Sequence, residues 1–300
     1  MRFGAHLPIA GFTHRLPEAS AIVQYAEAAE ALGFTTVCAN DHLLFSVPWL
    51  DGLIALGLAA GRTSRVRLMT TAALLAVRGA APLGSALAAL QYLSEGRLTA
   101  AVTPGSTRAD YESVGSDFDT RWSRFDHEIP HLRTFLDRSL GAAAPPIWIA
   151  SWGSRAGLRR VAEFGDGWLA SAYHGTPEHL SDCQVYLRDR LAIFGKDLAR
   201  FPLALATMYL YVSDDRAELS SALELVRSPA ATSADLRDRL LIGTPDECVE
   251  RLRRLEAVGI SEVFVWPLRD EVAQLEFFAE EVVGRLGEEP PGGPSGSEMA

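Results

Sequence analysis

The chemistry-bearing residues of this sequence follow short apolar segments, and most are hydroxyls, histidines or aromatics. Asn40-Asp41-His42 follows one such segment, and His6 and His174 follow others. A glycosidase would need two carboxylates from different segment ends, and Asp41 stands alone. His6, His42 and His174 could converge on a metal, but carboxylates to orient them are scarce, so we expect no metal site. Aromatic rings and hydroxyls instead suit a planar, phosphorylated organic cofactor, whose ring stacks on apolar walls.

The segment from Pro146 to Ser171 predicts a strand, a helix and a second strand. Residues 147–150 are apolar, and Ser151-Trp152-Gly153-Ser154 ends the run. Ser154 is a good N-cap for the following helix, whose first N–H groups would lie at the positive end of the helix dipole. A phosphate would fit there, beside Gly153. Many such turns carry Gly and Ser only to cap a helix, so the turn alone leaves both interpretations open.

Strands and helices alternate along the rest of the chain. We expect strands at residues 2–7, 35–39, 66–72, 98–102, 147–150, 168–170, 202–212 and 262–266. We expect helices at 17–32, 50–60, 82–93 and 121–136, after Ser154, and at 179–194, 215–226, 228–239 and 246–258, with a loop at 103–120. Eight strands, each followed by a helix, predict an α/β fold of the (β/α)8 TIM-barrel type. A doubly wound sheet is the alternative, weakened by the absence of Gly-x-Gly-x-x-Gly after the first strand.

The composition of the chain indicates its domain organisation and the kinds of partner it can bind. The chain has 300 residues, of which 48% are hydrophobic, enough for one barrel domain over residues 1–286, and residues 287–300, rich in Pro, Gly and Ser, predict a disordered tail. A net charge of −10 argues against nucleic acid or an anionic membrane as a partner. The three cysteines are far apart, the first residues do not resemble a secretion signal, and the apolar segment 50–60 is too short to cross a bilayer. We therefore expect a cytoplasmic protein.

Several segments together resemble the bacterial luciferase-like oxidoreductases, a superfamily of FMN-dependent monooxygenases and enzymes that use the deazaflavin coenzyme F420. They are Asn-Asp-His at 40–42, Leu-Ser-Glu-Gly-Arg-Leu at 93–98, Gly-Asp-Gly-Trp at 165–168, and residues 67–71, 121–128, 243–245 and 258–260. The resemblance spans roughly residues 2–286. It implies a TIM barrel with a flavin or deazaflavin ring over its mouth, a small-molecule substrate and a homodimer.

The resemblance also implies roles for individual residues. His42 and Asp41 match a pair that touches the cofactor head group and supplies a candidate acid or base, because hydride transfer to a carbonyl needs a proton at neutral pH. Thr71-Ala72 falls where family members often have a non-prolyl cis peptide behind the ring. The implied cofactor-binding residues are His6, Asp41, Thr71, Ala72, Ser106, Ser151, Trp152, Gly153, Ser154 and Ser171, the last five around the phosphate. Without the resemblance, His42 is best explained as a loop residue hydrogen-bonded to Asp41.

Some positions depart from the family pattern. Ser106 stands where some F420-dependent members have a glutamate, so no acid can be assigned there. Trp152 replaces a common glycine in the phosphate turn, and the connection 136–145 is short, which predicts an open mouth. Arg78 could reach an anionic cofactor tail or substrate, although a loop arginine commonly faces solvent.

Three functions remain open, with coenzyme F420 or FMN as the expected cofactor. The first is F420-dependent hydride transfer to or from a small organic substrate, which the Asp41-His42 pair favours. The second is FMN-dependent monooxygenation with reduced flavin and oxygen. The third is a non-catalytic flavin-binding member of the family, which the short connection 136–145 and the missing glutamate favour.

Overall fold

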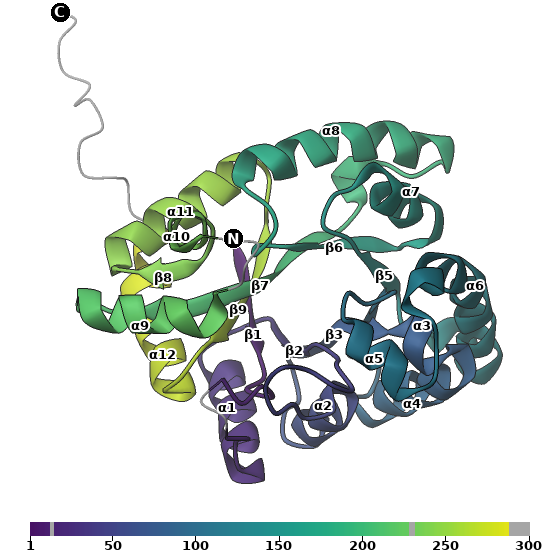
Figure 1. Ribbon diagram of the computed structural model, residues 1–300, viewed down its shortest axis with the longest axis horizontal. Helices are drawn as coiled ribbons and strands as arrows, with labels where there is room; N and C mark the ends of the chain where they lie inside the picture. Colours follow the sequence, from purple (N-terminus) through teal and green to yellow (C-terminus); the bar gives the residue numbers. More distant parts are fainter. Residues whose placement is uncertain (13–14, 228–231, 288–300) are drawn as a thin grey trace, which may run out of the picture.

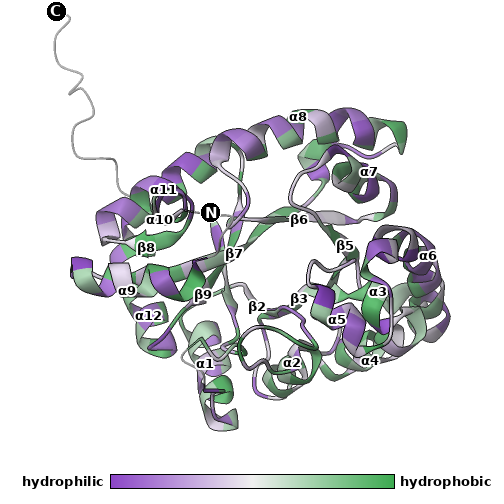
Figure 2. Ribbon diagram, viewed as in Figure 1, coloured by the Kyte–Doolittle hydropathy of each residue, from purple (hydrophilic) through white to green (hydrophobic). Residues whose placement is uncertain are grey.

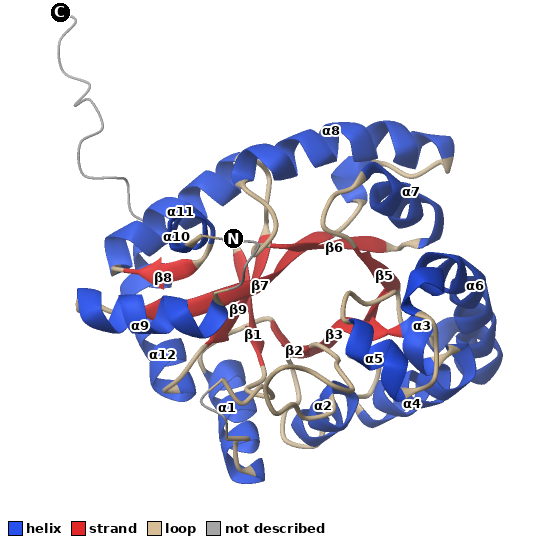
Figure 3. Ribbon diagram, viewed as in Figure 1, coloured by secondary structure: helices blue, strands red, loops and turns tan. Residues whose placement is uncertain are grey.

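Eight parallel strands close into a barrel in the computed structural model, which describes residues 1–12, 15–227 and 232–287. Figures 1 and 3 show the strands as an inner ring surrounded by helices. In order around the ring they are β1 (Arg2–His6), β2 (Thr36–Ala39), β3 (Arg67–Leu74), β4 (Leu98–Thr103), β5 (Ile147–Ala150), β6 (Gly167–Ser171), β7 (Leu203–Val212) and β9 (Glu262–Pro267). Pairing of β9 with β1 and of β6 with β7 closes the ring. The predicted TIM barrel is confirmed.

The helices pack outside the barrel, and several begin at residues that satisfy their first N–H groups. Asp51 caps α2 and Ser154 caps α7, as the sequence predicted for Ser154. The larger helices are α1 (Ala19–Ala31), α2 (Gly52–Ala60), α4 (Ala80–Leu93), α6 (Arg121–Leu140), α7 (Arg155–Phe164), α8 (Pro177–Ile193), α9 (Arg216–Val226), α11 (Pro245–Ala257) and α12 (Glu271–Phe278). Shorter ones are α3 (Leu75–Arg78), α5 (Arg108–Ser113), α10 (Ser233–Arg239) and α13 (Gly284–Leu286).

Several parts of the chain differ from the sequence predictions. A ninth strand, β8 (Leu241–Gly243), pairs with β7 outside the ring, and its three residues are too few to show a period in the sequence. The predicted loop 103–120 contains α5, whose Asp110 and Tyr111 are buried. Strand β3 continues to Leu74, beyond the predicted end at residue 72, and its pairing with β4 shifts in register between Thr70 and Ala73. The predicted tail at 288–300 and part of the predicted helix at 228–239 lie outside the described residues.

Large and small side chains complement each other inside the barrel. A Cβ atom on Gly4 would lie 2.4 Å from a ring carbon of Phe264, and a Cβ atom on Gly167 would lie 2.4 Å from ring carbons of Trp148. The interior cluster otherwise consists of Cys38, Met69, Ala72, Ala101, Leu169, Ala204 and Ala206. Glycine is therefore required opposite the two large rings, because the interior is filled and has no space for a further carbon. Figure 2 shows hydrophobic colour along many of the strands and over most of α2.

Candidate active site

The carboxyl ends of the parallel strands meet at one rim of the barrel, so residues far apart in sequence come together there. His6 ends β1, the 40–42 segment follows β2, and Ser151 follows β5. Ser171 ends β6, and its hydroxyl lies 3.0 Å from Nδ1 of His174. The rim therefore gathers most of the residues that the sequence assigned to the site.

A series of touching aromatic rings runs along this rim, and we call it the aromatic arc. Its members, in order of contact, are Trp152, His174, Tyr173, Tyr209, Trp266, Trp49, His42 and Phe45. Trp152 lies flat on His174, with ring centroids 3.7 Å apart and an interplanar angle of 12°. The arc connects the turn after β5 to the loop after β2 and offers apolar ring faces to a planar ligand. Tyr209 and Trp49 were missed by sequence reasoning, because neither directly ends a predicted strand.

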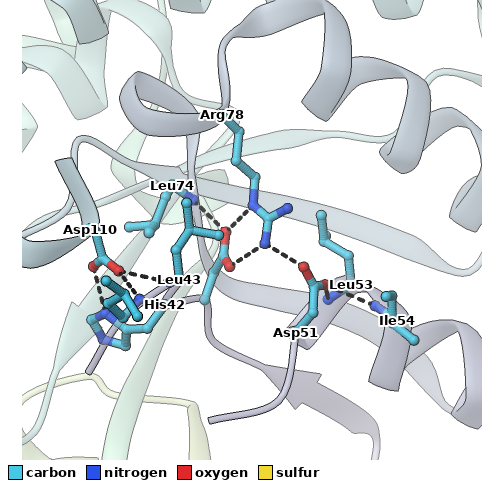
Figure 4. A network of polar contacts seen from close by, with 10 residues as sticks. His42, Leu43, Asp51, Leu53, Ile54, Leu74, Arg78 and Asp110 are labelled. Atoms are coloured by element: carbon cyan, nitrogen blue, oxygen red, sulfur yellow. Dashed lines mark hydrogen bonds and ion pairs between the residues drawn. The ribbon is translucent and has the colours of Figure 1, made fainter. Parts of the chain in front are cut away.

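Asp41 is buried in an ion pair with Arg78, whose side chain is labelled in Figure 4. Nε and Nη2 of Arg78 donate to the two carboxylate oxygens at 2.7 and 2.6 Å, and the Leu74 N–H donates to Asp41 at 3.0 Å. Nη2 of Arg78 also donates to Asp51 at 2.6 Å. Burial by itself would lower the pKa of Arg78, but its hydrogen bonds and charge interactions with both aspartates raise that pKa above its ordinary value. Two carboxylates of the chain engage Nε and Nη2 of Arg78, and contact between Arg78 and an external anion stays a prediction.

His42 pairs with a residue that the sequence did not identify. Its Nδ1 lies 2.8 Å from Oδ2 of Asp110 in α5, and the alternative hydrogen bond to Asp41 is not formed. Asp110 is fully buried and also accepts the N–H groups of Leu43 and Leu44 at 2.7 and 2.9 Å. The one signal for Asp110 was the length of the segment 103–120, which is long for a loop without structure of its own.

His6 is held in place by the chain on both sides of its ring. Its Nδ1 donates to the Leu7 carbonyl at 2.8 Å, and its Nε2 accepts the Asn40 N–H at 3.0 Å. Burial lowers the pKa of His6 to about 3, with the Leu7 hydrogen bond opposing the shift only in part. Its ring stacks on Trp266 with centroids 3.5 Å apart. Both ring nitrogens are therefore engaged by the backbone, which leaves no free lone pair on His6 for a metal.

The turn after β5 has the geometry expected of an anion site at a helix N-terminus. Ser154 Oγ accepts the Gly157 N–H at 3.1 Å, and Ser151 Oγ accepts the Gly153 N–H at 3.2 Å. Among the described residues, the N–H groups of Ser154, Arg155 and Ala156 have no hydrogen-bond partner. Trp152 is 53% exposed and lies over His174, so it does not fill the turn. An anion could therefore approach the start of α7.

Helix α8 supports this turn from behind. Nε2 of His179 donates to the Trp152 carbonyl at 3.0 Å, and the Cys183 thiol donates to the Gly153 carbonyl at 3.5 Å. Gly153 has φ of +97°, a conformation that favours glycine. The turn is therefore held through the Trp152 and Gly153 carbonyls, while the N–H groups of Ser154, Arg155 and Ala156 remain available.

The remaining predicted residues lie at the rim but make fewer polar contacts. The Thr71–Ala72 peptide bond is cis, as the family resemblance implied, and both residues are buried in β3. Ser106 is exposed, immediately after Gly105 and before α5. In the described ranges, no group of three or more His, Cys, Asp or Glu side chains could hold a metal ion. None of the helices in the described part of the chain is long and apolar enough to cross a membrane.

The chain is similar to known proteins in sequence and in fold. The chain is 25% identical to the F420-dependent glucose-6-phosphate dehydrogenase of Beutenbergia cavernae over 88% of this chain and 93% of that protein. Its structure resembles the monooxygenase RslO1 from Streptomyces bottropensis, with a TM-score of 0.81 and 23% identity over 95% of this chain and 99% of that one.

A flavin-containing structure is also similar. The oxygenating constituent of 3,6-diketocamphane monooxygenase from Pseudomonas putida, a type II Baeyer-Villiger monooxygenase in complex with FMN, has a TM-score of 0.72 and 15% identity, covering 95% of this chain and 98% of that one. The two structural matches show a shared fold. The model of the luciferase-like monooxygenase family matches residues 1–262, and the chain therefore belongs to that family.

Proposed function

We propose that this protein is an F420-dependent oxidoreductase that transfers a hydride between the deazaflavin and a small organic substrate. The observation that carries the proposal is the position of His42. Its Nδ1 is bound by buried Asp110, and in the described part of the chain its Nε2 has no hydrogen-bond partner. His42 also belongs to the aromatic arc that leads from the anion-binding turn. A group able to transfer a proton thus lies near one end of a surface suited to a planar, phosphorylated cofactor.

The residues at the rim fit such a cofactor. The free N–H groups at the start of α7, with Ser151, Gly153 and Ser171 beside them, would hold its phosphate. The aromatic arc would provide apolar faces near its ring. Two further polar atoms near the rim, Oδ1 of Asn40 and Nε1 of Trp49, are buried without a partner and would be satisfied by a polar ligand edge. Asp41, His6, Thr71, Ala72, Ser106, Trp152 and Ser154 stay predicted cofactor contacts.

His42 would act through Nε2. Oxidation of an alcohol breaks one C–H and one O–H bond, and bound coenzyme F420 would supply the hydride acceptor. The proton of the hydroxyl would pass to the unprotonated Nε2, and in the reverse direction Nε2–H would return it to a carbonyl oxygen. Asp41 would have a different part, because its oxygens are engaged by Arg78 and the Leu74 N–H. It would hold the 40–42 segment in place.

FMN-dependent monooxygenation is the second candidate, and the similarity to an FMN-bound monooxygenase favours it. Titration of tryptophan fluorescence with F420 and, separately, with FMN distinguishes the cofactors, since Trp152, Trp49 and Trp266 lie in the arc. We expect F420 to bind with micromolar affinity and to be reduced by an alcohol from a test panel without consumption of oxygen. Tight FMN binding with oxygen consumption would support the second candidate. Binding without turnover, unchanged in His42→Ala, would support a non-catalytic role.

We also propose that the protein is a homodimer through the outer face of α2 and α4. Neither helix contains a charged residue, whereas helices that face water on one side ordinarily do. Ile54 is 75% exposed and Tyr92 is 79% exposed on this face, with Leu58 and Leu93 beside them. Sedimentation of the wild type should give a dimer, and Ile54→Glu with Leu58→Glu should give a monomer. A monomeric wild type would reject the proposal.

The cytoplasm is the proposed location. Cys38, Cys183 and Cys248 are all buried free thiols, as expected in a reducing compartment. A fluorescent fusion retained with the soluble fraction after cell lysis would support this location, and recovery from the medium would reject it.

A further inference from the structure

The two carboxylate oxygens of Asp110 have separate partners (Figure 4). Oδ1 accepts both backbone N–H groups, those of Leu43 and Leu44, at 2.7 and 2.9 Å. Among the described residues, the hydrogen-bond partner of Oδ2 is Nδ1 of His42, at 2.8 Å. An ionised carboxylate has no proton to donate, so Nδ1 must carry the hydrogen of this bond. The neutral imidazole is then confined to one tautomer, in which Nε2 bears a lone pair.

The contact between His42 and Asp110 is buried on the side of Asp110. The Asp110 side chain has no exposed surface, whereas the His42 side chain is 13% exposed. The edge of the ring that carries Nδ1 therefore faces the protein interior. The exposed part of the ring lies away from Asp110. Phe45 and Trp49 pack against the ring at centroid distances of 4.4 and 4.8 Å and restrict its rotation.

Helix α5 is itself anchored, so Asp110 does not depend on a free loop. Tyr111, the next residue, is fully buried and donates its hydroxyl hydrogen to the Pro104 carbonyl. Its ring packs edge-on against Phe118 at 5.5 Å, and Arg121 lies 3.9 Å from the centroid of Phe118. The segment between β4 and α6 is thereby folded onto the barrel and presents Asp110 at a fixed position.

We infer that Asp110 is the positioning residue for His42, because it fixes the Nδ1–H tautomer and leaves Nε2 to exchange the substrate proton. This inference rests on the proposed function, in which Nε2 takes the hydroxyl proton while the hydride passes to F420. It assigns a role to α5, a segment that the sequence predicted to be a loop. Ser106, the position where some family members have an acid, lies in the same segment and is exposed.

Asp110→Asn tests the inference with little change in shape. Its Oδ1 would still accept the two backbone N–H groups, which leaves the amide nitrogen facing His42. That nitrogen can only donate, so Nδ1 would become the acceptor and the hydrogen would move to Nε2. In a Ser-His-Asp triad the same change leaves the geometry intact and lowers kcat about 10⁴-fold through the wrong tautomer.

The main measurement is the tautomer of His42 in the cofactor-free full chain. Long-range ¹H–¹⁵N correlation spectra of ¹⁵N-histidine-labelled protein report it, and the spectrum of His42→Ala assigns the signals. We expect Nδ1–H in the wild type and Nε2–H in Asp110→Asn. Asp119→Asn is the control, because Asp119 is exposed in the same segment and pairs with Arg108. It should leave the wild-type tautomer. An Nε2–H tautomer in the wild type would overturn the inference, even if Asp110→Asn did not fold.

The second measurement is turnover with an alcohol from the test panel that reduces F420 in the presence of the wild type. Asp110→Asn should lower kcat about 10²-fold, the scale of general acid–base catalysis, and change KM less than twofold. Equal kcat in Asp110→Asn and wild type, despite a changed tautomer, would overturn the role in proton transfer. If no F420-dependent turnover is found, the proposed function fails, while the NMR result still decides whether Asp110 fixes the tautomer.

Discussion

Arg78 and Asp41 form a two-point ion pair below the rim of the barrel, with Nε to Oδ2 at 2.7 Å and Nη2 to Oδ1 at 2.6 Å. The same guanidinium reaches Asp51, the N-cap of α2. The Asp41 side chain is only 2% exposed, and Arg78 is its counter-ion. The pair fixes the loop that carries His42 from one side, as Asp110 fixes it from the other.

Loss of Arg78 should therefore destabilise the fold. Arg78→Met leaves the buried Asp41 carboxylate without a counter-ion, and the free energy of unfolding should fall by about 3 kcal/mol. Urea denaturation measures the change. Arg62→Met is the control, because Arg62 pairs with Glu27 at the surface and should cost less than ~1 kcal/mol. Similar losses in the two variants would contradict the structural role of Arg78.

Acid should weaken the fold through buried His6 and, to a smaller extent, through the more exposed His174. Burial lowers the pKa of His6 to about 3, and burial followed by the charge of Arg239 lowers the pKa of His174 to about 4. The unfolded chain binds these protons near pH 6.5, so stability is constant above that pH and falls as pH decreases toward the folded-state values. His6 should cost about 1 kcal/mol between pH 7 and 5.5, and His174 should cost less because solvent reaches its side chain.

Denaturation of His6→Gln at both pH values checks this expectation. The variant lacks the titrating group and should lose about 1 kcal/mol less than the wild type over the same interval. His131→Gln, which alters an exposed histidine on α6, should retain the wild-type pH dependence. If His6→Gln and the wild type lose the same free energy, the buried neutral state of His6 is wrong.

Adding a methyl group at Gly167 inside the barrel should destabilise the fold. Gly167→Ala would place Cβ 2.4 Å from ring carbons of Trp148, and the required shifts should lower the free energy of unfolding by about 2 kcal/mol. Gly57→Ala, in α2, meets its nearest atom at 3.7 Å and should instead raise stability by about 0.5–1 kcal/mol through helix propensity. Thermal unfolding of both variants gives the comparison, and a shift of the same sign in both would contradict the packing argument.

The anion-binding turn should be sensitive to a side chain at position 153. A Cβ atom on Gly153 would lie 2.5 Å from both Cys183 Sγ and His179 Nε2, which hold the turn by hydrogen bonds. Gly153→Ala should weaken cofactor binding at least about tenfold, or ~1.4 kcal/mol, in fluorescence titration. Gly33→Ala shares the positive-φ strain, at +85°, but has no neighbour within 4 Å, and it should leave cofactor affinity unchanged. Unaltered affinity in Gly153→Ala would argue against a phosphate at this turn.

The order of strands and helices was predictable because the signals are local. The apolar run 147–150, the Ser154 cap and the glycines at 165 and 167 act over a few residues, and each produced the predicted element. Parallel strands end at the same rim, so the sequence also located most site residues at one edge. β8 was missed because three residues are too few to show a period, and α5 because its pattern is shorter than two turns.

What the sequence determined alone was the alternation of strands and helices, their caps, and the set of residues at the strand ends. The tertiary structure decided which of those residues meet. His42 could have paired with Asp41, one residue away, and it pairs instead with Asp110, 68 residues away, while Arg78 takes Asp41. The reason is that a hydrogen-bond partner is set by distance in space, and only barrel closure and the folded segment after β4 bring α5 beside the loop after β2.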